Sequence, residues 1–224
     1  MKLFAAPDRT KGSVSMSPAT PIVFVVDDDI SVRESLEALI RFAGWQPKTF
    51  GSAQEFLAYQ PVLVPNCLVL DVSLPGLNGL DLQNRLAADR NDMPIIFITG
   101  YGDVPMTVRA MKAGAVEFLT KPFNDDALLA AIGHALERSR DLLGHEAEFR
   151  VLSDRYNTLS SREREVMALV VTGLLNKQVA FELGISEITV KAHRGKVMHK
   201  MQAESLVDLA SMATKLRLSK APRD

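Results

Sequence analysis

Five polar side chains, each at the end of a hydrophobic run, carry groups that could bind a divalent cation and a phosphoryl group. They are three carboxylates, one hydroxyl and one ammonium group, on Asp27, Asp28, Asp71, Thr99 and Lys121. The preceding runs are rich in Val and Ile, which is typical of buried parallel strands. Because ligands bind at the carboxyl ends of the strands in an open α/β sheet, we expect all five side chains to converge.

The three carboxylates predict a magnesium site. Close carboxylates repel one another unless a cation lies between them, and Mg²⁺ prefers oxygen ligands and few protein carboxylates. We expect Asp28 and Asp71 to be inner ligands and Asp27 to bind directly or through a water molecule. The backbone carbonyl of Ser73 is expected to complete the protein's share of the ligands.

Asp71 is also the candidate nucleophile, because a carboxylate can accept a phosphoryl group to form an acyl phosphate. Such a transfer needs mainly positioning and charge neutralisation. Lys121 would supply a second positive charge and Thr99 a hydroxyl donor, with the small Gly100 leaving room beside it. Each residue alone is a weak signal, whereas five together, one after another at strand ends, are highly specific.

Strands and helices alternate from residue 22 to about residue 136, and these elements must position the five residues. This order predicts an α/β fold with a flavodoxin-like, doubly wound parallel five-stranded sheet. The strands are predicted at 22–26, 46–50, 67–70, 95–99 and 116–119. The helices are predicted at about 31–42, 53–59, 79–89 and 105–113, with a fifth beginning near 125.

The last part of the chain is predicted to be all helical. Ser160 and Glu163 have the spacing of a capping box, and Asn176 and Ser186 can cap the two helices that follow. Gly184 can take a left-handed conformation between those two helices, which makes a helix-turn-helix. The four helices are predicted at about 161–172, 177–183, 187–201 and 205–215.

The third of these helices is predicted to read DNA in the major groove. Val190, Val197 and Met201 share one apolar face, and basic residues occupy much of the rest. An ordinary solvated face is the alternative interpretation, but the short capped helices before it favour a recognition helix. The candidate DNA contacts are Thr189, Lys191, Ala192, His193, Arg194, Gly195 and Lys196.

Composition indicates a globular protein with a basic C-terminal part. Of the 224 residues, 47% are hydrophobic and 24% are charged. Residues 1–142 carry 13 Lys and Arg against 17 Asp and Glu, whereas residues 143–224 carry 13 against 10. No apolar run could span a bilayer, and residues 1–20 lack the core of a signal peptide, so we expect a cytoplasmic protein without a membrane partner.

These features divide the chain into two domains. The phosphoacceptor domain is predicted at 21–136 and the helix-turn-helix domain at 156–218, with a mobile tail at 1–20 and a short tail at 219–224. Residues 137–155 are charged and are predicted to form a helical linker. A solvated helix and a dimerising helix both remain open for the linker, because its heptad pattern is poor.

The motifs around the five polar residues resemble the receiver domain of two-component response regulators, over about residues 21–140. The motifs are VVDDD at 25–29, LDVSLP at 70–75 followed by Gly79, ITG at 98–100 and TKPF at 120–123. The resemblance implies that a sensor histidine kinase phosphorylates Asp71. It also implies a cis bond between Lys121 and Pro122, which is plausible because only X-Pro bonds adopt cis at low cost.

The same resemblance implies a conformational switch. In the family, the hydroxyl residue that corresponds to Thr99 moves toward the phosphoryl group while an aromatic residue of the fifth strand turns inward. Phe118 has that position here, and a permanently buried core ring is the alternative interpretation for it. Leu74 replaces a commoner Met and preserves the apolar bulk.

The C-terminal motifs resemble the LuxR-type helix-turn-helix and place the whole chain near the NarL/FixJ-type response regulators. They lie at 160–166, 176–180 and 185–193, and residues 102–115 look most like the FixJ/TodT/StyR branch. The resemblance implies readout on the face formed by the fourth helix, fifth strand and fifth helix, and we hypothesise that this face forms a homodimer when the chain is phosphorylated. Double-stranded promoter DNA is the implied partner, and RNA polymerase is a further candidate.

The predicted function is therefore a phosphorylation-switched transcription regulator, not an enzyme. A DNA-binding protein that works without phosphate is one alternative, but the intact five-residue site argues against it. A Mg²⁺-dependent phosphohydrolase is another, but Ser73 stands where such enzymes generally carry a second acid. The sequence does not reveal the kinase, the signal or the operator.

Overall fold

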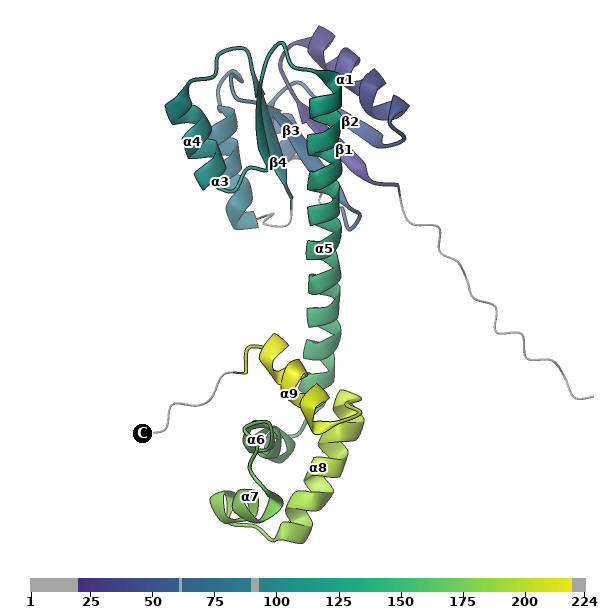
Figure 1. Ribbon diagram of the computed structural model, residues 1–224, viewed down its shortest axis with the longest axis vertical. Coiled ribbons are helices and arrows are strands. Elements are labelled where there is room, and N and C mark those ends of the chain that lie inside the picture. Colours follow the sequence, from purple (N-terminus) through teal and green to yellow (C-terminus); the bar gives the residue numbers. More distant parts are fainter. Residues whose placement is uncertain (1–19, 61, 90–92, 219–224) are drawn as a thin grey trace, which may run out of the picture. The chain divides into compact units, whose positions relative to one another are not determined.

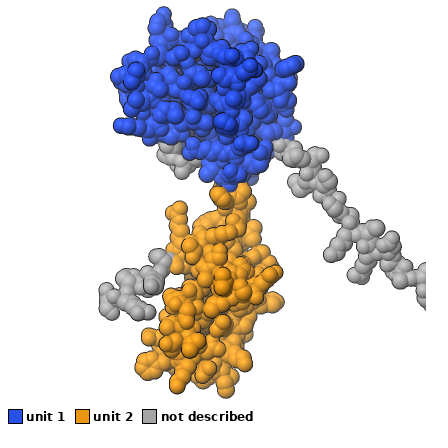
Figure 2. Space-filling view, in the orientation of Figure 1, with its two compact units in different colours: residues 1–143 blue, residues 144–224 orange. Residues whose placement is uncertain are grey.

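The computed structural model describes residues 20–60, 62–89 and 93–218. The predicted tails at 1–20 and 219–224 lie, except for Thr20, outside the described residues. The chain forms two compact units, residues 1–143 and 144–224 (Figure 2). Among the helices that the structure describes, none has the length and apolar character needed to cross a membrane.

The first unit contains a five-stranded parallel sheet in the order β2-β1-β3-β4-β5 (Figure 1). This order confirms the predicted doubly wound, flavodoxin-like fold. β1, β2 and β4 begin and end where the sequence predicts them. The strands are β1 (Ile22–Val26), β2 (Gln46–Phe50), β3 (Asn66–Asp71), β4 (Ile95–Thr99) and β5 (Glu117–Thr120).

Helices cover both faces of the sheet because strand residues alternate between the two. Val25 and Val69 point to one face, where they pack with residues of α1 (Ile30–Phe42) and α5 (Asp125–Asn157). Phe24 and Leu68 point to the other face. That face is covered by α2 (Ala53–Leu57) and by residues of α3 (Gly79–Asp89) and α4 (Val104–Lys112).

β3 and β5 differ from their predicted bounds, and pairing explains the difference. β3 extends to Asn66 and Asp71 because these residues pair with Ile22 of β1 and Ile98 of β4. The Asn66 N–H donates to the buried Ser139 hydroxyl at 3.1 Å, which joins β3 to α5. β5 starts one residue later than predicted because its register with β4 begins at Glu117. α2 ends at Leu57, two residues earlier than predicted.

α5 is one continuous helix of 33 residues. Its first part buries Leu128 and Ile132 against the sheet. Its last part belongs to the second unit, where Leu152 is buried and Tyr156 packs against the core. Residues 137–155, which were predicted to form a helical linker, are therefore helical and belong to this one helix.

The second unit contains the predicted helix-turn-helix. Gly184 ends the first helix of the motif with φ +64°, and the Ser186 hydroxyl caps the next helix by accepting from the Thr189 N–H at 3.1 Å. The expected cap at Asn176 is wrong, because Leu175 is the N-cap and the Asn176 side chain accepts from Arg194 instead. The helices are α6 (Ser161–Val170), α7 (Asn176–Leu183), α8 (Glu187–Met201) and α9 (Leu206–Lys215).

A buried carboxylate holds the start of α6. Glu163 accepts from the Ser160 N–H at 2.8 Å, which completes the predicted capping box, and from the Lys200 ammonium at 2.7 Å. The hydrogen bond from Lys200 and that from the Ser160 backbone lower the pKa of Glu163 to about 2. Lys200 also donates to the Thr158 carbonyl at 3.0 Å, so one ammonium group joins α8 to both sides of the α6 cap.

Replacing Gly79 with Ala should destabilise the first unit. A Cβ at position 79 would lie 2.5 Å from the Asp71 carbonyl oxygen, so the backbone beside Asp71 would have to move. We expect a loss of about 1–3 kcal/mol, typical of overpacking. The unfolding midpoint in urea, followed by the fluorescence of the single tryptophan, Trp45, measures it.

Gly133→Ala is the matched control for this substitution. A Cβ at position 133 meets open space within α5, so the higher helix propensity of alanine should stabilise the unit by about 0.5–1 kcal/mol. Equal effects of the two substitutions would contradict the predicted clash at position 79.

Glu163→Gln should make the second unit less sensitive to acid. The lowered pKa means that the Glu163 carboxylate stabilises the fold above about pH 4.5, and that this stabilisation is lost as the pH falls toward about 2. The variant should be about 1.5–3 kcal/mol less stable at pH 7, the size expected for a charged hydrogen bond, and should match the wild type near pH 2.

Thermal unfolding followed by circular dichroism at several pH values measures this difference. Glu165→Gln is the control, because Glu165 forms an exposed ion pair with Arg162 on the same helix. A Glu163→Gln variant whose stability follows the wild type at every pH would show that the ion pair with Lys200 contributes nothing.

Candidate functional site: an acidic phosphoryl site and a DNA-facing helix

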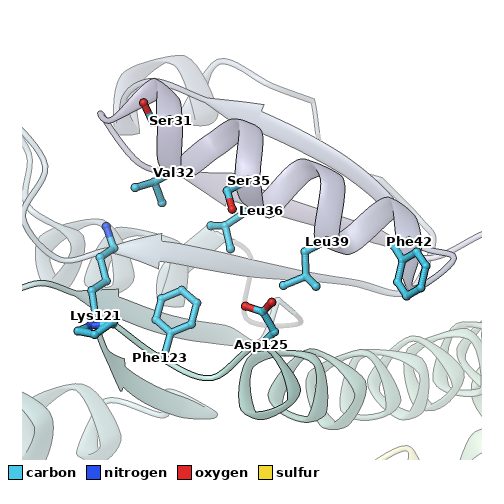
Figure 3. A pocket seen from close by; sticks show the side chains of 10 residues that line it. Ser31, Val32, Ser35, Leu36, Leu39, Phe42, Lys121, Phe123 and Asp125 are labelled. Atoms are coloured by element: carbon cyan, nitrogen blue, oxygen red, sulfur yellow. The ribbon is translucent and has the colours of Figure 1, made fainter.

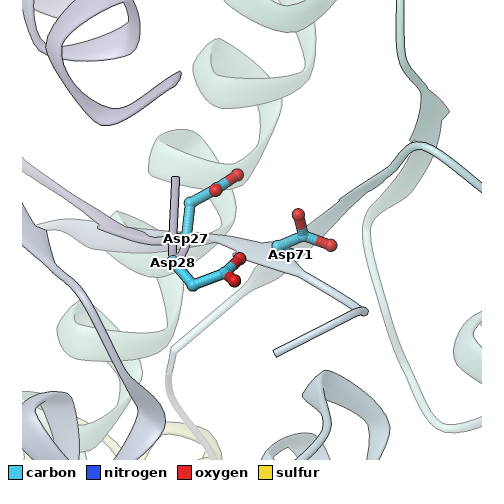
Figure 4. A group of neighbouring side chains, drawn as sticks. All are labelled: Asp27, Asp28 and Asp71. Carbon is cyan, nitrogen blue, oxygen red and sulfur yellow. The ribbon is translucent and has the colours of Figure 1, made fainter. Parts of the chain in front are cut away.

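Strand pairing brings the three predicted carboxylates together at one edge of the sheet. β1 and β3 are neighbours, and Val26 pairs with Leu70, so Asp27 and Asp71 follow at the same level. Figure 4 shows these two side chains and Asp28 grouped around one position. Their carboxylate groups each place an oxygen within 4.8 Å of the others. The predicted convergence of these residues is therefore present in the structure.

Lys121 bridges the two buried carboxylates. Its ammonium nitrogen lies 2.7 Å from an oxygen of Asp27 and 2.7 Å from an oxygen of Asp71. The Lys121 N–H donates to the Thr99 carbonyl at 2.7 Å, which fixes the end of β5 beside β4. The bond between Lys121 and Pro122 is cis, as predicted. Lys121 directly follows β5, which is two strands away from β3 in the sheet, and its side chain reaches the carboxylates at the end of β1 and β3.

Hydrogen bonds orient the remaining carboxylate oxygens. The second oxygen of Asp27 accepts from the Asp29 N–H at 2.9 Å, and that of Asp71 accepts from the Ser73 N–H at 2.8 Å. Asp28 is exposed, whereas Asp27 is fully buried. The site therefore combines two fixed carboxylates with a third that is open to solvent.

Burial and charge act against each other in this group. Burial raises the pKa of the Asp27 carboxyl, although the hydrogen bonds from Lys121 and Asp29 act in the opposite direction. Burial alone would lower the pKa of the Lys121 ammonium, but the hydrogen bonds to Asp27 and Asp71 outweigh it, and this pKa is raised. The carboxylates are thus held close together by one cation, and a divalent cation would neutralise them further.

Arg33 supports the site from α1 and was missed from the sequence. One of its guanidinium nitrogens donates to the backbone carbonyls of Asp27, at 2.6 Å, and Asp28, at 3.0 Å. These bonds fix the loop that carries both carboxylates. The signal in the sequence was a basic residue in the first turn of the helix after the acidic loop, where the side chain can reach back over the turn.

Thr99 lies at the edge of the site, but its hydroxyl has another partner. The hydroxyl oxygen accepts from the Tyr101 N–H at 3.2 Å and lies 3.4 Å from the Tyr101 carbonyl oxygen. A Cβ on Gly102 would lie 3.0 Å from the ring of Phe118, so the loop after β4 contacts that half-buried ring. The structure therefore connects Thr99 and Phe118 through the same loop.

A groove opens beside Lys121. It has a volume of about 640 Å³ and lies between α1 and the segment that follows β5 (Figure 3). Val32, Leu36 and Leu39 line one wall, and Phe123 lies opposite. The groove therefore joins an apolar surface to the charged end of the sheet.

The predicted DNA contacts fall into two groups on α8. Lys191, Ala192, Gly195 and Lys196 are exposed. The others are half-buried: the Thr189 hydroxyl shares a hydrogen bond with Ser186, and Arg194 donates to Asn176 at 3.1 Å. His193 is half-buried as well. Ile188, an exposed apolar residue of this helix, was not among the predicted contacts.

Two family models match the chain, one on each unit. The response regulator receiver domain matches residues 23–133, and the luxR family of bacterial regulatory proteins matches residues 157–213. The first match covers the acidic site, and the second covers α6 to α8 and most of α9.

Relatives align over nearly the whole chain. Nodulation protein W of Bradyrhizobium diazoefficiens is 54% identical over 94% of this chain and 93% of its own length. The response regulator protein TodT of Pseudomonas putida is 43% identical over 90% of this chain and 89% of its own. The solved structure of the response regulator StyR is 47% identical, covers 88% of this chain and 100% of its own, and has a TM-score of 0.78.

Arg33→Ala should destabilise the first unit in the absence of metal. The change removes two hydrogen bonds from a guanidinium group to backbone carbonyls, so we expect a loss of about 1–3 kcal/mol. Unfolding in urea with a chelator, followed by Trp45 fluorescence, measures it.

Arg41→Ala provides the matched control on the same helix. Arg41 forms an exposed pair with Glu37, so its removal should change stability by less than about 0.5 kcal/mol. If both variants unfold at the wild-type midpoint, the Arg33 bonds do not hold the acidic loop.

Proposed function

This chain belongs to the response regulators that join a receiver domain to a LuxR-type DNA-binding domain, and we propose that Asp71 is its phosphoacceptor. The observation that carries the proposal is the pair of 2.7 Å contacts from Lys121 to Asp71 and Asp27. Lys121 neutralises charge where a phosphoryl group would add more of it. Asp71 attacks the phosphorus of a phosphohistidine, so the new O–P bond forms as the N–P bond breaks.

The acidic group supports Mg²⁺ as the metal of this reaction. Asp27, Asp28, Asp71 and the Ser73 carbonyl would hold it, because their oxygen donors are of the kind that Mg²⁺ prefers. When bound, the ion supplies charge that stabilises the transferring phosphoryl group. Arg33 keeps the loop of Asp27 and Asp28 in place, and the Ser73 N–H orients the Asp71 carboxylate.

The contacts of Thr99 support its role in the switch. Its hydroxyl has one hydrogen to donate, so it can donate to a phosphoryl oxygen on Asp71 only by giving up its 3.4 Å contact with the Tyr101 carbonyl. That loss frees the loop in which Gly102 lies against Phe118. Phosphorylation would then change the position of the Phe118 ring by changing the loop beside it.

An apolar stripe on α4 supports a homodimer of the phosphorylated form. Val104, Val108 and Met111 are all exposed and lie three or four residues apart, so they share one side of the helix. Val104 exposes 76% of its surface. A second copy of the chain would cover these side chains, and two DNA-binding units would then reach two half-sites of promoter DNA.

The groove between α1 and the segment after β5 supports contact with a sensor histidine kinase. Lys121 is both a lining residue of the groove and the partner of Asp71. A kinase helix whose apolar side lies in this groove would bring its phosphohistidine close to the acidic site. We also propose RNA polymerase as a further partner and the cytoplasm as the compartment in which promoter DNA is bound.

Phosphorylation of Asp71 should be detectable on the intact protein. After incubation with a small acyl-phosphate donor and Mg²⁺, we expect a mass gain of one phosphoryl group. The gain should disappear in Asp71→Asn and fall strongly in Lys121→Ala, because the second variant lacks the cation between the carboxylates. Asp81→Asn, at an exposed position of α3, is the control and should be phosphorylated like the wild type.

Sedimentation of the phosphorylated sample then tests the dimer. A wild-type chain that gains no mass while folded, or that gains it equally in Asp71→Asn, would contradict the proposed phosphoacceptor. A chain that stays monomeric when fully phosphorylated would contradict the proposed dimer but not the assignment of Asp71 as the phosphoacceptor.

A further inference from the structure

Apart from Glu187, its first residue, the exposed residues of α8 form one continuous stripe. Each of them lies three or four positions from another member, which places them on one side of a helix of 3.6 residues per turn. The buried residues Val190, Val197 and Met201 lie on the opposite side, in the core of the second unit. The stripe consists of Ile188, Lys191, Ala192, Gly195, Lys196 and His199.

Small residues in the middle of this stripe would allow the backbone of α8 to come close to DNA bases. Ala192 and Gly195 lie along its centre, and Lys191 and Lys196 lie on either side. A Cβ on Gly195 would meet no atom within 4 Å among the described residues, so packing within the chain does not require glycine there. Glycine nevertheless weakens a helix by about 1 kcal/mol relative to alanine. Small residues between two lysines are what a helix needs when its backbone approaches base edges while its cations reach phosphates.

Ile188 is the apolar residue of this stripe. It is the second residue of α8 and exposes 83% of its surface. It lies in line with Ala192, Gly195 and His199, on the side of the helix opposite the core. Isoleucine is β-branched and is not among the best helix formers, so neither helix propensity nor burial accounts for it.

We propose that Ile188 packs against the C5-methyl group of a thymine and thereby selects thymine at one position of each half-site. The N-terminal residues of a recognition helix face base edges. In the major groove, the methyl group of thymine is the apolar feature that distinguishes one base pair from another. The inference rests on the proposed DNA-binding role of α8 and adds which base it reads and through which residue.

The test uses the phosphorylated full-length chain and a duplex selected by that chain from a random library. Each thymine of the selected duplex is replaced in turn by deoxyuridine, which removes only the methyl group. At one position per half-site, we expect wild-type affinity to fall about fourfold, the effect of burying one methyl group. Deoxyuridine at the other positions should leave affinity within about twofold of the unmodified duplex.

The variant Ile188→Ala identifies the residue that contacts the methyl group. It should bind the thymine duplex several times more weakly than wild type and should no longer distinguish thymine from deoxyuridine at that position. Val207→Ala is the matched control, because Val207 is an exposed apolar residue of α9 outside the stripe and its variant should keep the wild-type discrimination.

The possible results separate the two proposals. Failure of the phosphorylated wild type to enrich any duplex would contradict the DNA-binding role itself. Binding that is insensitive to deoxyuridine at every thymine, or equally sensitive in wild type and Ile188→Ala, would overturn the contact by Ile188 and leave the DNA-binding role intact. Circular dichroism confirms that each variant is folded before its affinity is measured.

Discussion

The convergence of two buried carboxylates on one ammonium group is the interaction on which the first unit depends. Asp27 and Asp71 lie side by side because β1 and β3 pair in parallel, and like charges at that distance need a cation between them. Lys121 meets this need with two 2.7 Å contacts, which requires β5 to end at the same edge of the sheet. The order of the strands and the charge balance of the site therefore support each other. Any phosphoryl group or metal that enters must interact with these same three side chains.

Direct contacts also connect the acidic site to more distant parts of the receiver domain. Lys121 donates through its backbone to Thr99, and the Thr99 hydroxyl contacts Tyr101 in the next loop. That loop approaches Phe118 at Gly102. A chain of direct contacts thus runs from the acidic site to a half-buried ring beside α4, whose exposed apolar side chains are available to a second copy. Each link is a hydrogen bond or a packing contact, and the proposed switch would act through these links.

On α8 of the second unit, the residues that stabilise the fold lie apart from the residues proposed to contact DNA. One side of α8 supplies Val190, Val197 and Met201 to the core, and Lys200 ties the helix to the buried Glu163 at the start of α6. The other side carries small, basic and apolar residues that the core does not use. Because the core uses only the first side, substitutions on the second side should cost the fold little stability.

The sequence by itself determined the elements and the chemistry of this protein. Hydrophobic periodicity and turn residues are local signals, so they located β1, β2, β4 and α8 to the residue and identified the three carboxylates, Lys121 and the capping box at Ser160. Only the tertiary structure decided which partners distant side chains take. Arg33 binds two carbonyls, Arg194 turns to Asn176, the Thr99 hydroxyl is held by Tyr101, and Ile188 faces outward. The reason is physical: a side chain's partner depends on distances between elements that packing sets, and no local pattern in the sequence encodes those distances.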